Sequence, residues 1–417
     1  MKIHRHGFKR LLNVDEALKI FLREVKPIDE YEYVDLRGVV GRVLYEDIYS
    51  PIDVPDFNRA AMDGYAVRSE DVISASEDSP IRLKIIGYSS TSKPFNGVLN
   101  SGEAVKIDTG AYLPEGADAV VMVEYTYEVG GYVDIFKPVS RYENVSLRGE
   151  DIRKGDKIAS RGRLITSQDV MALGNIGIER FKVFRKAKIG IAAFGSELVD
   201  GPGGEGFKVR EVNRLFMEKF LSEYPIEIRD YGIIPDEEDK IRDVIMDMVS
   251  ENDIAVSFGG TSLGEDDLVT EIVDSLGEVY VHGVALQPSK PVLLAKIDGK
   301  PYIGLPGYPV AVAISSEVFI RPILERILGI SSKRIENRIR GRLSRRIPSK
   351  IGLRHYVRVK VRILDGEYIV EPIYASGAGI TSSLIYADGY LVIDENKEGF
   401  EEGEYVDVYL FRRYIEG

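Results

Sequence analysis

The sequence predicts an α/β + β multidomain protein, in which one α/β domain is combined with mostly-β domains. Its 417 residues suffice for about two to four domains, each with its own hydrophobic core. From about residue 30 to 185, short alternating runs are broken by Gly, Pro and Asp, a pattern typical of β-structure. Over residues 186–330, apolar runs alternate with helical patterns, and the β pattern returns after residue 330.

Composition excludes several function classes. The chain has no Cys and only four His, so we expect neither disulfides, nor a Cys nucleophile, nor a His-rich metal site. No apolar run approaches the ~20 residues of a membrane span. The basic start "MKIHRHGFKRLL" lacks the apolar run of a signal peptide. We therefore expect a cytoplasmic protein without a membrane partner.

The charge distribution argues against a nucleic-acid partner. The net charge is -12, which disfavours general binding to a polyanion. Residues 331–362 are an exception, because they hold 12 Lys and Arg against the single acid Glu336. This segment is interpreted as a solvated face of a strand-rich domain, an anion-binding surface or a nucleic-acid patch. No nucleic-acid-binding module accompanies it, so we expect no nucleic-acid partner.

Two local elements of the first half are well marked. Residues 130 and 131 in "AVVMVEYTYEVGGYVDIFKPV" are glycines between alternating runs, which predicts a hairpin. Residues 13–25 carry one apolar face at helical spacing, and Asn13 with Glu16 fits a capping box, so a helix is predicted there. The apolar face consists of Val14, Ala17, Leu18, Phe21, Leu22 and Val25.

The central segment predicts a parallel sheet with helical crossovers. The runs "AKIGIAAF", "DIAVSF", "EVYVHGVAL" and "KPYIGLP" are of the buried-strand type. A helix is predicted in "DEEDKIRDVIMDMVSEN", with Asp236 as its N-cap. Strands that alternate with helices are wound by right-handed crossovers. Because ligands bind outside the carboxyl ends of such strands, the loops that leave these runs are the candidate site.

These loops carry residue types that suit a phosphate and a metal ion. The loop "GGTSLGEDD", residues 259–267, has glycines and hydroxyls before a helix, so its backbone amides could face a phosphate. Its acids would repel a phosphate unless a cation lay between, and hard oxygen ligands beside phosphate suggest Mg²⁺. "FGSELVDG", "LQPSKP" and "GLPGYP" add acids, Lys290 and prolines. The alternative for each loop is that glycines only permit tight turns and acids only cap a helix.

Eight sequence blocks occur in the order seen in one enzyme family. They are "PDFNRAAMDGYAV", "IDTGAYLPEGADAVVMVE", "RGEDIRKGD", "FGSEL", "EVNR", "GGTSLGEDD", "QPSKP" and "GLPGYPVAV". With them the chain resembles the molybdopterin molybdenumtransferases, the molybdenum insertases that also form one half of gephyrin. The resemblance implies a three-layer α/β molybdopterin-binding-like domain and a C-terminal β-barrel-like domain. It also divides the chain into a linking domain (1–50 with 146–185, whose helix packs on the α/β domain), an inserted β-rich domain (51–145), the α/β domain (186–330) and a C-terminal β domain (331–417).

The resemblance implies a function in molybdenum cofactor biosynthesis. Members are taken to insert molybdate, or tungstate, into adenylylated molybdopterin with Mg²⁺ and to release AMP. A homodimer is implied, with each active site joining the α/β domain of one subunit to the β domain of its partner. Contact with the preceding enzyme, the molybdopterin adenylyltransferase, is a further expectation. The alternatives are a non-catalytic molybdopterin-binding paralogue or scaffold, and phosphate chemistry like that of a pterin adenylyltransferase.

Matching the blocks position by position assigns the site residues. The catalytic acids are Asp63, Asp151, Glu197 and Asp267, of which Glu197 and Asp267 would hold the metal. The substrate-binding residues are Thr109, Glu211, Gly259, Gly260, Ser262, Gly264, Lys290, Pro306, Pro309, Arg354 and Ser376.

Several positions depart from the family's pattern. Glu211 replaces an Asp and His355 replaces an acid, whereas Phe258 stands where Ser is expected. Four further departures are expected to alter substrate contacts and motivate the non-catalytic alternative. They are Phe194 for Thr, Gln287 for Lys, Ser289 for Gly and Tyr308 for Asn.

Overall fold

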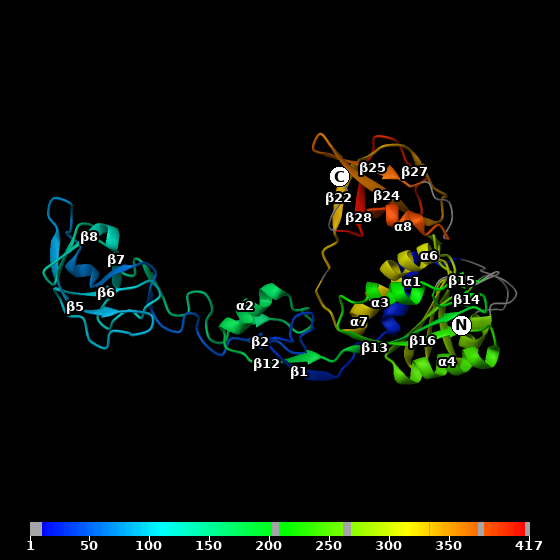
Figure 1. Cartoon of the computed structure of the whole chain (residues 1–417), viewed down its shortest axis with the longest axis horizontal. Helices are drawn as coiled ribbons and strands as arrows, with labels where there is room; N and C mark the ends of the chain where they lie inside the picture. The colour runs from blue at the N-terminus through cyan, green and yellow to red at the C-terminus, as the bar shows by residue number, and fades with distance from the viewer. Residues whose placement is uncertain (1–10, 202–207, 262–267, 333, 374–378, 413–417) are drawn as a thin grey trace.

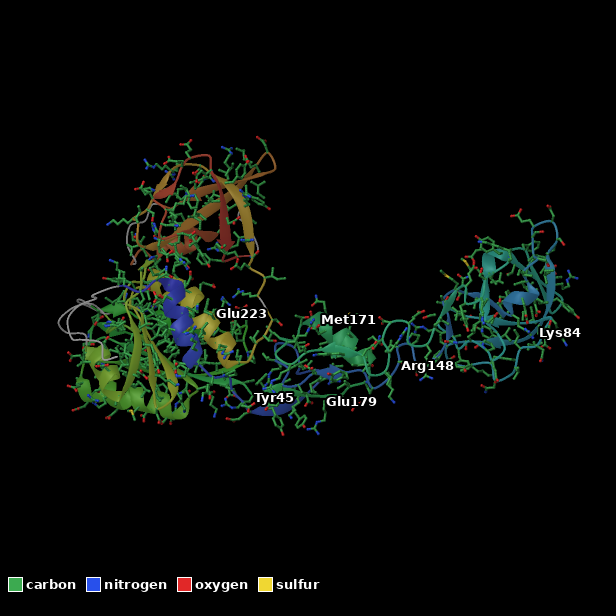
Figure 2. The ribbon with its side chains drawn as sticks, turned by 180° about the vertical axis from the view of Figure 1, so that it is seen from behind. Tyr45, Lys84, Arg148, Met171, Glu179 and Glu223 are labelled. Atoms are coloured by element: carbon green, nitrogen blue, oxygen red, sulfur yellow. The ribbon has the colours of Figure 1, made fainter. Side chains whose placement is uncertain are left out.

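The chain forms an elongated molecule, shown in Figure 1 as a computed structural model. The structure describes residues 11–201, 208–261, 268–332, 334–373 and 379–412. One β domain lies at one end, and the α/β domain lies at the other with a second β domain beside it (Figure 1). Seen from behind, Lys84 lies on the remote β domain and Glu223 on the α/β domain, with Met171 of the linking region between them (Figure 2). No helix in the described residues is long and apolar enough to cross a membrane.

Helix α1 (Val14–Glu24) forms where its capping residue and apolar face predict it. The side chain of Asn13 accepts hydrogen bonds from the backbone N–H groups of Asp15 (2.9 Å) and Glu16 (3.4 Å). Its apolar face is buried in the core of the α/β domain rather than in the linking region. The helix therefore packs in the α/β domain, although that domain begins more than 150 residues later in the sequence.

The linking region is built from two separate passes of the chain. β1 (Tyr31–Asp35) pairs antiparallel with β12 (Arg180–Phe184). β2 (Ile48–Tyr49) pairs with β11 (Lys157–Ala159), and α2 (Ser167–Asn175) begins with a capping box formed by Thr166 and Asp169. The remote β domain is therefore an insertion between these passes.

The remote β domain contains a six-stranded sheet of order β7-β4-β6-β5-β9-β8. The predicted hairpin at Gly130 and Gly131 is confirmed, and both glycines have positive φ. β3 (Arg59–Ala60) and β10 (Val145–Ser146) pair beside the sheet. The sheet strands are β4 (Gly64–Val67), β5 (Ile81–Ser89), β6 (Glu103–Ile107), β7 (Ala119–Met122), β8 (Thr126–Val129) and β9 (Tyr132–Ile135). The short 3₁₀ turns are η1 (Ser69–Asp71) and η2 (Val123–Tyr125).

The α/β domain has the predicted three layers. Its sheet has the order β16-β13-β17-β21-β20-β18, and separate hydrophobic clusters cover the two faces. α4 and α5 pack on one face, whereas α1, α3, α6 and α7 pack on the other. The strands are β13 (Ala187–Phe194), β16 (Ile226–Ile234), β17 (Ile254–Phe258), β18 (Gly277–His282), β20 (Leu293–Ile297) and β21 (Lys300–Leu305). The helices are α3 (Asn213–Phe220), α4 (Glu238–Glu251), α5 (Leu268–Leu276), α6 (Pro309–Ser315), the π-helical turn η3 (Ser316–Ile320) and α7 (Arg321–Ile327).

Two sequence predictions for this domain are wrong. The sheet is mixed, because β20 runs antiparallel to both β18 and β21. Since β18 itself runs in the same direction as β21, the loop after it still leaves at the shared carboxyl edge. Asp236 does not cap α4, because Glu237 occupies the N-cap position.

The C-terminal β domain is a closed barrel. β24 pairs with both β25 and β26, and β22 and β28 complete the circuit. β19 (Leu286–Gln287), which leaves the α/β domain, pairs parallel with the start of β24 and joins the two domains. The other elements are β22 (Arg338–Leu343), β23 (Ile347–Pro348), β24 (Arg354–Leu364), β25 (Glu367–Pro372), α8 (Ser382–Tyr386), β26 (Gly389–Ile393), β27 (Gly399–Phe400) and β28 (Tyr405–Leu410).

Candidate active site

Glycine and proline loops meet at the carboxyl edge of the α/β sheet. Gly259 follows β17 with a φ of +88°, and its N–H donates a 2.9 Å hydrogen bond to the carbonyl oxygen of Leu305. A Cβ at Gly259 would lie 2.4 Å from the carbonyl oxygen of Phe194. A Cβ at Gly307 would lie 3.7 Å from the Cα of Gly259. The loops after β13, β17 and β21 are therefore in backbone contact, and position 259 requires glycine.

A buried hydroxyl lies beside these glycines. The side chain of Thr261 is 1% exposed, and its Oγ1 has no hydrogen-bond partner among the residues that the structure describes. Buried polar atoms are normally paired, so this oxygen is a candidate for a ligand contact. The following predicted residues, Ser262, Gly264 and Asp267, lie outside the described residues.

Two acids mark the same edge of the sheet. Glu197 is exposed, and a Cβ at Gly195 would lie 2.8 Å from either of its carboxylate oxygens. Ser196 and Asp236 hold each other reciprocally, through Ser196 N–H to Asp236 Oδ2 (2.8 Å) and Asp236 N–H to Ser196 Oγ (2.9 Å). Asp236 is an acid at this edge that sequence reasoning did not place there. Its signal was the strand pattern of "IEIRDYGII", which ends two residues earlier.

Glu211 is an anchor within the protein. It is 8% exposed, and its carboxylate accepts from the N–H of Asn213 (2.6 Å) and from Nε of Arg214 (3.1 Å). Asn213 Nδ2 then donates to the carbonyl oxygen of Gly307 (2.8 Å). Glu211 thus holds the start of α3 against the proline turn, and its predicted contact with substrate stays a prediction.

The loop after β18 brings Lys290 to the edge as an exposed side chain. The Lys290 carbonyl oxygen accepts from the N–H groups of Val284 (2.8 Å) and Val292 (3.0 Å), which fixes the loop. Ser289 has a φ of +97°, a region that favours glycine, and its hydroxyl hydrogen-bonds to Ser315 in α6. The departure at Ser289 therefore adds a bond between loop and helix.

The proline turn completes this edge. Pro306 is buried after β21, and Pro309 occupies the first turn of α6, where its missing N–H costs no hydrogen bond. Tyr308, between them, is 63% exposed, and its predicted effect on substrate contacts stays a prediction.

The rings of Phe194 and Phe258 are buried in the core of the α/β domain. They are 2% and 1% exposed, and they pack in the hydrophobic clusters on opposite faces of the sheet. The ring of Phe194 therefore lies in the core, and its expected effect on substrate contacts stays a prediction.

Asp63 and Thr109 form a second polar centre, in the remote β domain. Asp63 Oδ1 accepts from both the N–H and the hydroxyl of Thr109, each at 2.7 Å. These bonds, the backbone bond first, hold the pKa of Asp63 below its usual value, so the exposed carboxylate is ionised at neutral pH. Asp151 is also exposed, and its N–H donates to the carbonyl oxygen of Val54 (3.1 Å).

The structure keeps these two centres apart within one chain. β4 and β6, which flank Asp63 and Thr109, lie at the opposite end of the molecule from β13 and the sheet edge (Figure 1). The loops of the α/β domain meet one another, and Asp63 meets Thr109, but no contact joins the two sets among the described residues.

Arg354 is engaged by acids of two domains. Its guanidinium donates to both carboxylate oxygens of Asp15 in α1 (2.7 and 2.6 Å), and its Nε lies 3.2 Å from Glu395. The hydrogen bond with Asp15 is the main cause of the raised pKa of Arg354. An oxyanion would have to displace Asp15, so molybdate binding at Arg354 stays a prediction. Ser376, its predicted companion, lies outside the described residues.

Burial lowers the pKa values of two further basic residues of β24, His355 and Arg358. Arg358 is 5% exposed, and burial lowers its pKa, while its Nε donates to Ser383 Oγ (3.2 Å). Burial, followed by the nearby charge of Arg358, lowers the pKa of His355 to about 4. His355 is therefore neutral at pH 7 and supplies no charge where the family has an acid.

Comparisons with known proteins cover almost the whole chain. Residues 12–177 match a model of the MoeA N-terminal region (domain I and II). Residues 190–326 match a model of a probable molybdopterin binding domain. Residues 340–411 match a model of the MoeA C-terminal region (domain IV). A Methanocaldococcus jannaschii protein named for molybdopterin biosynthesis is 39% identical over 96% of each chain. The molybdopterin molybdenumtransferase of Staphylococcus epidermidis is 30% identical over 96% of this chain and 95% of its own length.

A solved structure of similar extent gives the same result. The molybdopterin biosynthesis MoeA protein from a Pyrococcus species superimposes with a TM-score of 0.83 at 36% identity, over 97% of this chain and 100% of the other. The chain therefore belongs to the MoeA family of molybdopterin molybdenumtransferases, transferases of molybdenum cofactor biosynthesis.

Proposed function

We propose that the protein inserts molybdate or tungstate into adenylylated molybdopterin, with Mg²⁺, and releases AMP. The observation that carries this proposal is the turn formed by Gly259, Gly260 and Thr261 at the carboxyl edge of the α/β sheet, which we call the cradle. There, Gly259 lies against the carbonyl oxygen of Phe194, and the buried hydroxyl of Thr261 lacks a partner among the described residues. The exposed acids Glu197 and Asp236 lie at the same edge.

The cradle suits the phosphate groups of an adenylate. Gly259 and Gly260 both have positive φ, and neither carries a side chain that would block approach to the backbone. Consecutive backbone N–H groups in such turns form concave anion sites. Thr261 Oγ1 could donate a further hydrogen bond to a phosphate oxygen. Exposed Lys290, on the neighbouring loop, supplies a positive charge for an oxyanion.

The donors at this edge fit Mg²⁺. Within the described residues, no three His, Cys, Asp or Glu side chains gather into a metal-binding group. Mg²⁺ typically takes only one or two carboxylates and completes its shell with substrate phosphates and water. Glu197 offers one exposed carboxylate, and Asp267, the other proposed ligand, lies outside the described residues. When bound, the ion would neutralise charge on the phosphoanhydride.

Asp63 would complete the site from a partner subunit. Within one chain it lies at the far end of the molecule from the cradle (Figure 1). We propose a homodimer in which the remote β domain of one subunit reaches the α/β domain of the other. The ionised carboxylate of Asp63 could then orient a nucleophilic oxygen or accept a proton. Its two bonds to Thr109 fix the carboxylate for either role.

The direct test is AMP release from adenylylated molybdopterin with Mg²⁺ and molybdate or tungstate. Native protein should release AMP only when the oxyanion is present, and Asp63→Asn or Glu197→Gln should abolish release. Asp78→Asn is the matched control, because Asp78 is an exposed acid of the same remote domain. Tight binding of the substrate without AMP release by native protein would favour the non-catalytic paralogue instead. Release without any oxyanion would point to simple adenylate hydrolysis.

A further inference from the structure

A cavity lies apart from the cradle, where the C-terminal barrel meets η3 of the α/β domain. Its volume is about 620 Å³, within the range of small-molecule sites. The barrel strands β22, β24, β26 and β28 provide most of the lining, and Glu317 and Val318 of η3 close one side. Apart from Arg354, none of the lining residues belongs to the site described above.

The walls of this cavity are rich in aromatic side chains. Tyr390 is central, because its ring centroid lies 5.4 Å from the centroids of both Tyr356 and Tyr409. Tyr390 and Tyr409 are stacked, with an interplanar angle of 14°. Phe400 and Tyr405 add two further rings to the lining. Aromatic rings present a negative face, which attracts ammonium and guanidinium groups.

The charge of the lining is negative. Four carboxylates, Glu317, Glu336, Asp394 and Asp407, face two guanidinium groups, those of Arg340 and Arg354. The charge of Arg354 is already matched by Asp15 and Glu395 outside the lining. Arg340 lies over the ring of Tyr405, 6.0 Å from its centroid. The cavity therefore offers more negative than available positive charge.

Not all four acids are equally free. Glu317 pairs with Arg321 at 2.8 Å, and Asp407 lies 3.6 Å from Arg338. Within the described part of the chain, Glu336 and Asp394 have no ion-pair partner, and both are exposed. Burial, and next the charge of Glu317, raise the pKa of Tyr390, which agrees with a negative field at the centre of the cavity.

We propose that this cavity binds a free aliphatic polyamine. Ammonium groups would pair with Glu336 and Asp394, and the methylene chain would lie along the rings of Tyr390 and its neighbours. A bare divalent cation fits less well, because it prefers a shell of oxygen ligands and gains little from aromatic walls. Since η3 belongs to the α/β domain and the other walls to the barrel, a bound amine would tie the two domains together.

The test is calorimetric titration of the full chain with spermidine at low ionic strength. Native protein should bind it, and Glu336→Gln with Asp394→Asn in one variant should weaken binding roughly tenfold. Glu402→Gln is the matched control, because Glu402 is an exposed acid of the same barrel that does not line the cavity. It should leave the affinity within about twofold of native. Tyr390→Leu should weaken binding as well, because it removes the central ring.

Several outcomes would overturn the proposal. Equal affinity in the double variant, or equal binding of a neutral diol of similar length, would show that charge does not select the ligand. Binding of sulfate in place of spermidine would assign the cavity to an anion at Arg340 and Arg354. Binding of a lysine-rich peptide without binding of spermidine would assign it to a protein partner. Thermal melting of each variant without ligand shows whether its fold is retained, and none of these measurements depends on AMP release.

Discussion

The two polar centres of this molecule are built in different ways. At the sheet edge of the α/β domain, backbone shape dominates, because Gly259 packs on Phe194 and the proline turn packs on Gly259. In the remote β domain one carboxylate dominates, and Thr109 holds the side chain of Asp63 with two bonds. The first centre can cradle a ligand, whereas the second can present a charge. Because each centre supplies what the other lacks, we propose that the two meet across a dimer.

The largest effect is expected from the backbone contact at the cradle. Gly259→Ala would place a Cβ 2.4 Å from the carbonyl oxygen of Phe194. Gly102→Ala is the matched control, because Gly102 has a similar positive φ but nothing within 4 Å of the added Cβ. We expect Gly259→Ala to lower the free energy of unfolding by about 1–3 kcal/mol more than the control does. Displacement of the cradle should also cost roughly a hundredfold in AMP release. Equal stability and activity of the two variants would contradict the close contact.

A smaller effect on AMP release is expected when Thr109, which holds the carboxylate of Asp63, is changed. Thr109→Val removes the hydroxyl bond to Asp63 and keeps the backbone bond, so the carboxylate should be less well oriented. AMP release should fall about fivefold to tenfold, with no change in the melting temperature. Ser101→Ala, in the same domain, removes a hydroxyl bond to the carboxylate of Asp71 at the opposite end of β6 from Thr109 and should leave turnover unchanged. Similar losses in both variants would mean that Thr109 acts only through the fold.

Thr109→Val should also change the pH dependence of AMP release. Asp63 has a lowered pKa, so it stays ionised as the pH falls until that lowered value is reached. Loss of one bond to the carboxylate should raise this pKa toward the usual value. The acid limb of turnover should therefore move to higher pH in Thr109→Val, and the alkaline limb should not move. An acid limb that stays in place would show that Asp63 does not control it.

The smallest effect is expected at Arg354, where a variant of Asp15 tests whether the guanidinium only joins two domains or also binds an oxyanion. Asp15→Asn breaks the pair with Arg354 and should cost about 0.5–1 kcal/mol of unfolding free energy, because Asp15 is mostly exposed. Asp274→Asn, at another exposed acid of the α/β domain, is the control. If Arg354 serves only to tie α1 to the barrel, the KM for molybdate should be the same in both variants. A lower KM in Asp15→Asn would indicate that Asp15 and molybdate compete for Arg354.

Local patterns predicted much of the fold. The helix at Val14–Glu24 and the hairpin at Gly130 and Gly131 were predicted because their signals lie within a few residues. β16 was missed, because it is the edge strand of its sheet and carries Glu227, Arg229 and Asp230 among its apolar residues. Without that strand, Asp236 was interpreted as a helix cap rather than as an acid at the sheet edge.

Long-range contacts set the limit for the site. The pair of Arg354 with Asp15 joins residues 339 positions apart, and no local pattern indicates it. The sequence analysis considered Phe194 and Phe258 only as departures from family motifs. In the structure both rings lie in the core, because successive side chains of a strand point to opposite faces of the sheet and both faces are covered. The grouping of Asp63 with Thr109, in contrast, follows the resemblance, and the structure shows the two bonds that join them.

We propose that each active site takes Asp63 from one subunit and the cradle from the other. This arrangement is tested by mixing Asp63→Asn subunits with Glu197→Gln subunits and measuring AMP release. Random exchange should leave half of the dimers mixed, each with one intact site, so roughly a quarter of native activity should return. Activity that stays at the level of the separate variants, although subunit exchange is demonstrated, would contradict a shared site.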